Sequence, residues 1–111
     1  MKEFSLLEIL SLISGYLLIK KFDRLHELIE WIAGSPIFTH QISSVADILK
    51  KKAVEQFPQF NLQENISLNN DIEVLVKTLK RKDNETVLIE EMKLKYGETF
   101  LVKQGERIVK N

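Results

Sequence analysis

The chain has 111 residues, and its 16 lysine and arginine residues balance 16 aspartate and glutamate residues, so the formal net charge at pH 7 is zero. This balance excludes the global positive field that non-specific nucleic-acid binding draws on, although a local basic patch remains open. The lack of cysteine excludes disulfides, thiolate zinc sites and cysteine nucleophiles, and it favours a cytoplasmic protein. The length predicts a single globular domain over residues 1–111.

Apolar residues dominate the first predicted helix, from Phe4 to Ile13. Its solvent strip is expected to be narrow, formed by Ser5, Glu8 and Ser11. The stretch superficially resembles a signal segment, but Glu3 and Glu8 interrupt it. We therefore interpret it as a buried helix, with no membrane contact. It is covered by the core or by a partner, and its wide apolar surface allows a homodimer.

The next predicted helix contains the apolar repeat of residues 25–32 and begins after Asp23 as its N-cap. Gly15 ends the preceding helix, and Gly34 ends this one. Between the two helices, Tyr16–Ile19 is either a strand or an extended connection, and the local pattern leaves both open.

An interhelical turn, here residues 34–41, is predicted to join this helix to a third one. Pro36 lacks an N–H and prevents continuation of the second helix, and Thr39 is predicted to cap the third, which extends to Phe57. Ile37 and Phe38 are available to fill the turn. The predicted structural turn comprises Gly34, Pro36, Phe38, Thr39, His40 and Gln41.

Residues 59–69 are predicted to form a polar loop before two further helices. Asn70 is the expected N-cap of a fourth helix that reaches about Lys82, with Glu73 completing an approximate capping box. Asp83 or Asn84 is expected to cap a fifth helix that ends at Gly97.

Residues 72–96 also fit a competing β-hairpin that turns at Lys82–Asn84, because Val74, Val76 and Thr78 alternate. We predict the two helices. Thr99–Lys103 is strand-like, and Gln104-Gly105 can turn it toward Ile108 and Val109. The expected fold is therefore α+β and mostly helical, with about five helices and a small two- or three-stranded antiparallel sheet.

Three residues near the turn could in principle form a metal site, since His26 and Glu30 lie one helical turn apart and His40 opens the next helix. The favoured interpretation is structural, with His26 beside the apolar stripe and His40 hydrogen-bonded to the turn. Glu90 and Glu91 are adjacent and so diverge by about 100° on a helix, which makes them a poor catalytic pair. We predict no catalytic residue, no metal and no cofactor.

Two basic clusters are the candidate partner-binding residues. The first is Lys50, Lys51 and Lys52, and the second is Lys77, Lys80, Arg81 and Lys82. Each is placed toward the end of a predicted helix, where cations meet the negative end of the dipole and face solvent. A phosphate-contacting face is the alternative. Trp31 lies beside an apolar stripe and is more often a core residue, but an exposed Trp31 would be an interface hot spot.

The whole chain resembles a family of short proteins encoded by tailed phages and prophages. The matching motifs are ILSLISGYLL at Ile9–Leu18, LHELIEWIAGSPIFTHQ at Leu25–Gln41, the Phe-Pro step within Gln56–Pro58, and Tyr-Gly-Glu followed by a strand at Tyr96–Val102. Ile42-Ser43-Ser44 departs from a more usual Leu-Pro-Arg, so a role of that arginine does not transfer. The resemblance implies a phage origin and a shared small fold, without an activity.

From this context we expect a non-enzymatic, phage- or prophage-encoded binding protein in the host cytoplasm. Its concrete form is a stoichiometric inhibitor of a host defence system such as a CRISPR effector nuclease, with a host protein or ribonucleoprotein effector as partner. The alternative is a phage nucleic-acid-binding accessory protein that uses the lysine clusters.

Overall fold

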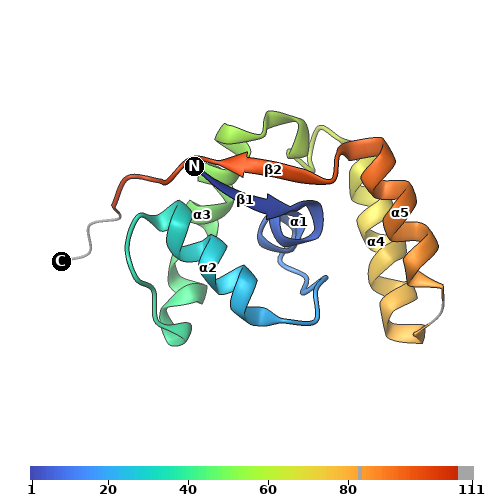
Figure 1. The fold of residues 1–111 in the computed structure, drawn as a ribbon, viewed down its shortest axis with the longest axis horizontal. Helices are drawn as coiled ribbons and strands as arrows, with labels where there is room; N and C mark the ends of the chain where they lie inside the picture. Colours follow the sequence, from blue (N-terminus) through green and yellow to red (C-terminus); the bar gives the residue numbers. More distant parts are fainter. Residues whose placement is uncertain (83, 108–111) are drawn as a thin grey trace.

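The structure is a computed structural model that describes residues 1–82 and 84–107. Two strands and five α-helices occur in these ranges, which confirms the predicted α+β, mostly helical fold. Their order is β1 (Lys2–Ser5), α1 (Leu6–Ser14), α2 (Phe22–Ala33), the 3-10 turn η1 (Thr39–Gln41), α3 (Ile42–Gln56), the 3-10 turn η2 (Pro58–Phe60), α4 (Ile66–Arg81), α5 (Glu85–Tyr96) and β2 (Thr99–Val102). The strands pass over α1, with α2 and α3 on one side of it and the α4–α5 pair on the other (Figure 1).

The sheet joins the two ends of the described chain. β1 and β2 are antiparallel, with Lys2 opposite Val102 and Ser5 opposite Thr99. The prediction of a helix from Phe4 was wrong, because Phe4 lies in β1, where it is almost completely buried. Residues 16–19 do not pair with the sheet and form a connection, so the described sheet has two strands.

The predicted solvent strip of α1 was also wrong. Ser5 is the N-cap, and its Oγ accepts a hydrogen bond from the Glu8 N–H (3.2 Å) while Glu8 Oε1 accepts one from the Ser5 N–H (2.8 Å). Ser11 Oγ donates to the Leu7 carbonyl oxygen (2.6 Å) and accepts from the Leu18 N–H (3.0 Å). Because these hydrogen bonds satisfy their polar atoms, Glu8 and Ser11 can be buried within the fold.

The predicted C-terminal ends of the helices match the structure better than their predicted starts. Gly15, Gly34 and Gly97 follow α1, α2 and α5 as predicted, whereas α2 begins after Lys21 rather than Asp23. α4 begins after Asn65 rather than Asn70, because the Asn65 side chain accepts from the Leu68 N–H (3.0 Å).

Residues 72–81 belong to α4 and residues 85–96 belong to α5, which confirms the two predicted helices and not the competing hairpin. Asn84 precedes α5 without a side-chain capping bond. The predicted cap Asp83 and the predicted strand residues Ile108 and Val109 lie outside the described residues.

The buried apolar residues form one cluster to which every α-helix contributes. α1 lies at its centre, covered by the rest of this chain, so its apolar residues do not need a second copy to bury them. Met92 and Leu75 connect α5 and α4 to the same cluster. Across the described ranges, the helices are too short or too polar to cross a membrane.

Candidate functional site

The interhelical turn is packed against the C-terminal segment. Gly34 adopts a left-handed conformation (φ +72°), and its N–H donates to the Glu30 carbonyl oxygen (2.9 Å). A Cβ on Gly34 would collide with the carbonyl oxygen of Gly105. The Gly105 N–H in turn donates to the Trp31 carbonyl oxygen (3.0 Å). Gly34 is therefore required by a close backbone approach as well as by its dihedral angles.

His26 and Glu30 hold the backbone of this turn. The Ile37 carbonyl oxygen accepts from His26 Nε2, and Glu30 Oε2 accepts from the Ile37 N–H (2.9 Å). Because a carbonyl can only accept, His26 carries a proton on Nε2. His40 is engaged elsewhere, in a ring stack with Phe38. Within the ranges that the structure describes, three His, Cys, Asp or Glu side chains do not gather in an arrangement that could hold a metal ion.

Of the remaining turn residues, one is buried in the core and others are exposed to solvent. Ile37 is buried as predicted, but Phe38 is 67% exposed and does not fill the turn. The Phe38 ring stacks on His40 with ring centroids 5.8 Å apart. Thr39 begins η1 and is not a helix cap; instead, Gln41 Oε1 accepts from the Phe38 N–H (2.9 Å).

Trp31 is half-buried and is not a free anchor. Its Nε1–H donates to the Val102 carbonyl oxygen in β2 (2.8 Å). The Lys2 ammonium lies 5.0 Å from its ring centroid. Trp31 therefore joins α2 to the sheet, which agrees with the structural interpretation of this residue.

One ion pair that sequence reasoning missed connects α1 to α2. Arg24 Nε lies 3.1 Å from Glu8 Oε2, and Arg24 Nη1 lies 3.2 Å from Glu27 Oε2. The hydrogen bond to Glu8 raises the pKa of Arg24 above its ordinary value. The Ser5-x-x-Glu8 spacing is a capping-box pattern and was the signal that could have located Glu8.

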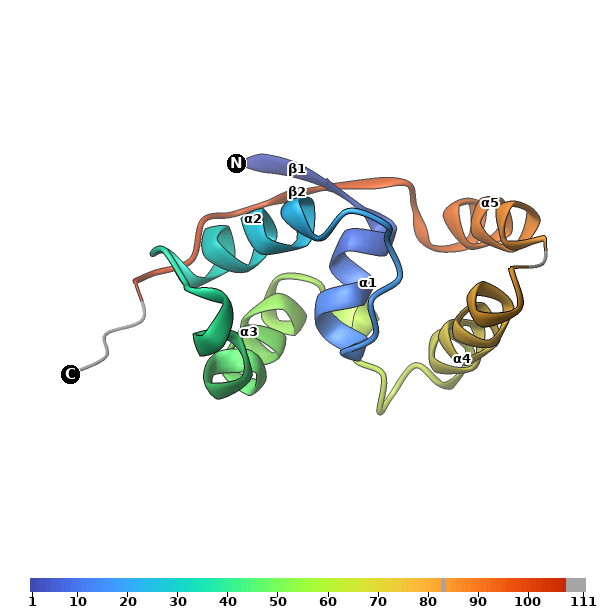
Figure 2. The same ribbon diagram turned by 90° about the horizontal axis from the view of Figure 1, so that it is seen from below.

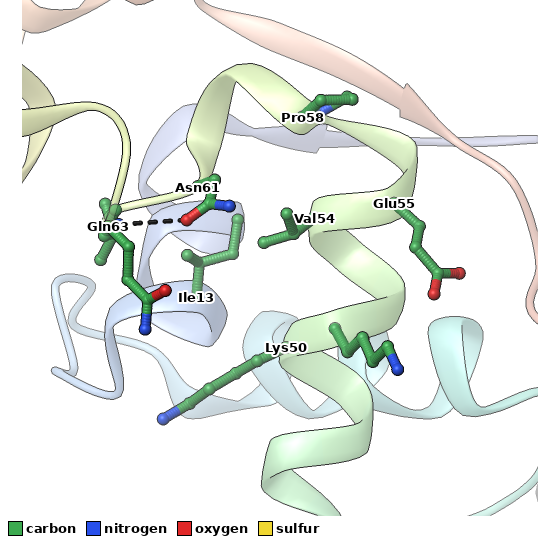
Figure 3. A pocket seen from close by; sticks show the side chains of 9 residues that line it. Ile13, Lys50, Val54, Glu55, Pro58, Asn61 and Gln63 are labelled. Atoms are coloured by element: carbon green, nitrogen blue, oxygen red, sulfur yellow. Dashed lines mark hydrogen bonds between the residues drawn. The ribbon is translucent and has the colours of Figure 1, made fainter.

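The first basic cluster separates in space, because successive residues on a helix diverge by about 100°. Lys52 Nζ donates to the Glu106 carbonyl oxygen (2.9 Å) and so contacts the C-terminal segment. Lys50 and Lys51 line an open hollow of about 690 Å³ between α3, the end of α1 and the chain after η2. Lys50 reaches past Ile13, on the side of α3 opposite to Glu55 (Figure 3). The cluster lies in the middle of α3, so its predicted position near a helix end was wrong.

The second basic cluster lies at the end of α4, as predicted. Lys80 and Arg81 are in the last turn, and Lys82 follows in a left-handed conformation (φ +55°). Lys80 lines a hollow of about 300 Å³, and Arg81 lines a different one of about 340 Å³ between α4 and α5. Lys77 is exposed one turn before. The cluster thus also divides between two surfaces.

The connection between α1 and α2 brings one lysine of each cluster to the same place. This connection lies on the side of α1 that faces α4 (Figure 2). Lys50 Nζ would be 3.3 Å from a Cβ built on Gly15. Lys80 shares its hollow with Tyr16 and Leu17, which are 52% and 55% exposed. We call Lys50, Tyr16, Leu17 and Lys80 the basic–aromatic face.

Carboxylates neutralise four cations elsewhere in the fold, whereas no carboxylate that the structure describes pairs with the two lysines of this face. Lys2, Arg24, Lys93 and Lys95 form ion pairs with carboxylates. Lys50 and Lys80 make neither a hydrogen bond nor an ion pair with any residue that the structure describes, and the same holds for Lys51, Lys77, Arg81 and Lys82. A chain with zero net charge therefore carries a locally positive surface.

One protein family matches residues 4–63, more than half of the chain: a domain of unknown function, DUF7736. The chain belongs to this family. The match includes Tyr16, Lys50 and the interhelical turn, whereas Lys80 and the α4–α5 pair lie beyond it. Neither the curated proteins nor the solved structures include a match to this chain.

Proposed function

We propose that this DUF7736 protein is a phage- or prophage-encoded binding protein that acts without catalysis, by stoichiometric inhibition of a host defence system such as a CRISPR effector nuclease. The observation that carries the proposal is the basic–aromatic face, where Lys50 and Lys80 lack partners among the described residues. An effector of this kind holds nucleic acid, so its surface offers phosphates as well as protein. The motif resemblance to phage proteins supports the origin.

Inhibition would follow from occlusion. Unpaired lysines attract a polyanionic partner over about 10 Å at 0.1 M salt, and exposed aromatic and aliphatic side chains then supply contact area. Tyr16 and Leu17 provide such area beside Lys80, and they directly follow Gly15, which the Lys50 ammonium approaches. A bound inhibitor needs no reactive group, because it blocks access of the target to the effector.

Capture from a host lysate tests the proposal. Tagged protein is incubated with a lysate containing the defence systems, with and without nuclease, and the eluted proteins are identified. We expect one stoichiometric partner that survives nuclease treatment. In a cleavage assay with that effector, inhibition should be complete near one inhibitor per effector, and multiple turnover would refute the proposal.

A matched pair of variants connects this result to the face. Lys50→Glu with Lys80→Glu should abolish capture. Lys103→Glu with Arg107→Glu changes the net charge by the same amount at exposed positions and should leave capture intact. Equal loss in both variants would mean that overall charge, rather than this face, determines binding.

The second candidate function, a nucleic-acid-binding accessory protein of the phage, is favoured by the same unpaired lysines. It predicts that the captured partner is lost on nuclease treatment. It also predicts a gel shift that weakens as salt rises and that Lys50→Glu with Lys80→Glu removes.

A further inference from the structure

We propose that the basic–aromatic face binds single-stranded nucleic acid, with phosphates against Lys50 and Lys80 and an unpaired base stacked on Tyr16. The inference rests on the proposed function in that it names the chemistry that this face recognises. It extends that function by assigning to Tyr16 the stacking of a base, in place of unspecific contact area.

The connection that carries Tyr16 is held at both ends. Gly15 closes α1 in a left-handed conformation (φ +82°), and its N–H donates to the Ser11 carbonyl oxygen (3.1 Å). Leu18 is buried, and its N–H donates to Ser11 Oγ (3.0 Å). The Tyr16 N–H donates to Ser14 Oγ (3.1 Å). The ring therefore projects from a short, anchored segment, which reduces the entropy lost on binding.

The environment of the ring suits a polyanion. Its hollow is lined by Tyr16, Leu17, Val76, Leu79 and Lys80, and this set contains no carboxylate. Glu55 lines the neighbouring hollow, but Glu55 and Lys50 extend from opposite sides of α3 and point away from each other (Figure 3). The Tyr16 hydroxyl has no hydrogen-bond partner among residues 1–82 and 84–107.

An exposed aromatic ring close to cations favours a single strand over a duplex. A ring can stack only on a base whose face is free, and duplex base faces are covered by their neighbours. Lysines, by contrast, contact the phosphates of either form. The Tyr16 contribution should therefore appear with single strands alone, which separates this proposal from simple charge attraction.

Fluorescence anisotropy with a labelled 12-nucleotide single strand and the duplex of the same sequence tests the inference. We expect tighter binding of the single strand. Tyr16→Ala should weaken it about 5- to 150-fold, the range that one stacked base contributes, whereas Tyr16→Phe should keep most of the affinity. Lys50→Glu with Lys80→Glu should reduce the salt slope by about 1.4, or about 0.7 for each lost phosphate contact.

Two controls separate loss of this face from a change in overall charge and from unfolding. Lys103→Glu with Arg107→Glu should bind as the unmodified protein does, and circular dichroism should show all variants folded. Equal affinity for strand and duplex, or an unchanged affinity for Tyr16→Ala, would overturn the inference. Oligonucleotide binding without effector inhibition would refute the proposed function alone, and effector inhibition without oligonucleotide binding would refute this inference alone.

Discussion

Two glycines that both end helices in left-handed conformations should tolerate alanine to different extents. Gly15 has φ +82° and Gly34 has φ +72°, so an added side chain meets similar backbone strain at both. Their surroundings differ. At Gly15 the nearest atom to a Cβ would be Lys50 Nζ (3.3 Å), the end of a flexible side chain, whereas at Gly34 it would be the backbone of Gly105.

The difference in free energy can be estimated from the contacts. Left-handed backbone costs a non-glycine residue about 1–2 kcal/mol, which is the expected loss for Gly15→Ala. Gly34→Ala must also displace the C-terminal segment and break the Gly105 N–H to Trp31 carbonyl hydrogen bond, worth about 1 kcal/mol. We therefore expect Gly34→Ala to lower the free energy of unfolding by about 2–3 kcal/mol.

Urea unfolding measures both values. Trp31 is the single tryptophan, so its fluorescence reports this junction, and far-ultraviolet circular dichroism reports the helices. With a denaturant slope of about 2 kcal/mol/M, the urea midpoint should fall by about 0.5–1 M for Gly15→Ala and by about 1–1.5 M for Gly34→Ala. Equal midpoints, or a larger loss for Gly15→Ala, would refute the claim that Gly34 is fixed by close backbone contact.

Three further outcomes are expected. Ser11→Ala leaves the buried Leu18 N–H without its acceptor, so urea unfolding should show a loss of about 1–3 kcal/mol, and no loss would mean that another acceptor replaces Ser11. Hydrogen bonding to Lys2 lowers the pKa of Glu27, so its contribution to stability is present above its unfolded-state pKa and is lost as pH falls through the lower folded value. Glu27→Gln should therefore make stability less dependent on pH in the acid range, and an unchanged acid profile would contradict this. Met92→Ala should cost about 2–5 kcal/mol in calorimetry, and a loss below about 1 kcal/mol would mean that α5 is not part of the common core.

The helices were predictable where the sequence carries local signals. Apolar periodicity located the helices, and Gly15, Gly34 and Gly97 located three of their ends, because each end depends on residues within one helical turn. The start of α4 failed for a local reason. Glu73 makes Asn70 the better cap in the sequence. In the structure Asn65 is the cap, and its side chain also donates to the Gln59 carbonyl oxygen (2.9 Å), a contact that the local pattern does not reveal.

β1 could not be found from local pattern alone. Phe4 fits the apolar stripe of the following helix, and its true partner, Phe100, is far away in the sequence. Such a pairing depends on the remaining chain having already brought the two ends together. The capping box at Ser5 and Glu8 was the available local evidence against a helix that begins at Phe4.

The candidate site, too, was predictable only where local sequence determines it, and its remaining features depend on the tertiary fold. Clusters of lysine are visible in the sequence, but helix geometry directs Lys50 and Lys52 to different surfaces, and Arg81 lines a different hollow from Lys80. The face that results brings one lysine from each cluster near Tyr16, a residue for which the sequence left a strand and an extended connection both open. This face can be locally positive on a protein of zero net charge, because 0.1 M salt screens the field of each charge beyond about 10 Å. A partner therefore senses the unpaired lysines near it more strongly than the neutralised pairs such as Lys2–Glu27 and Arg24–Glu8.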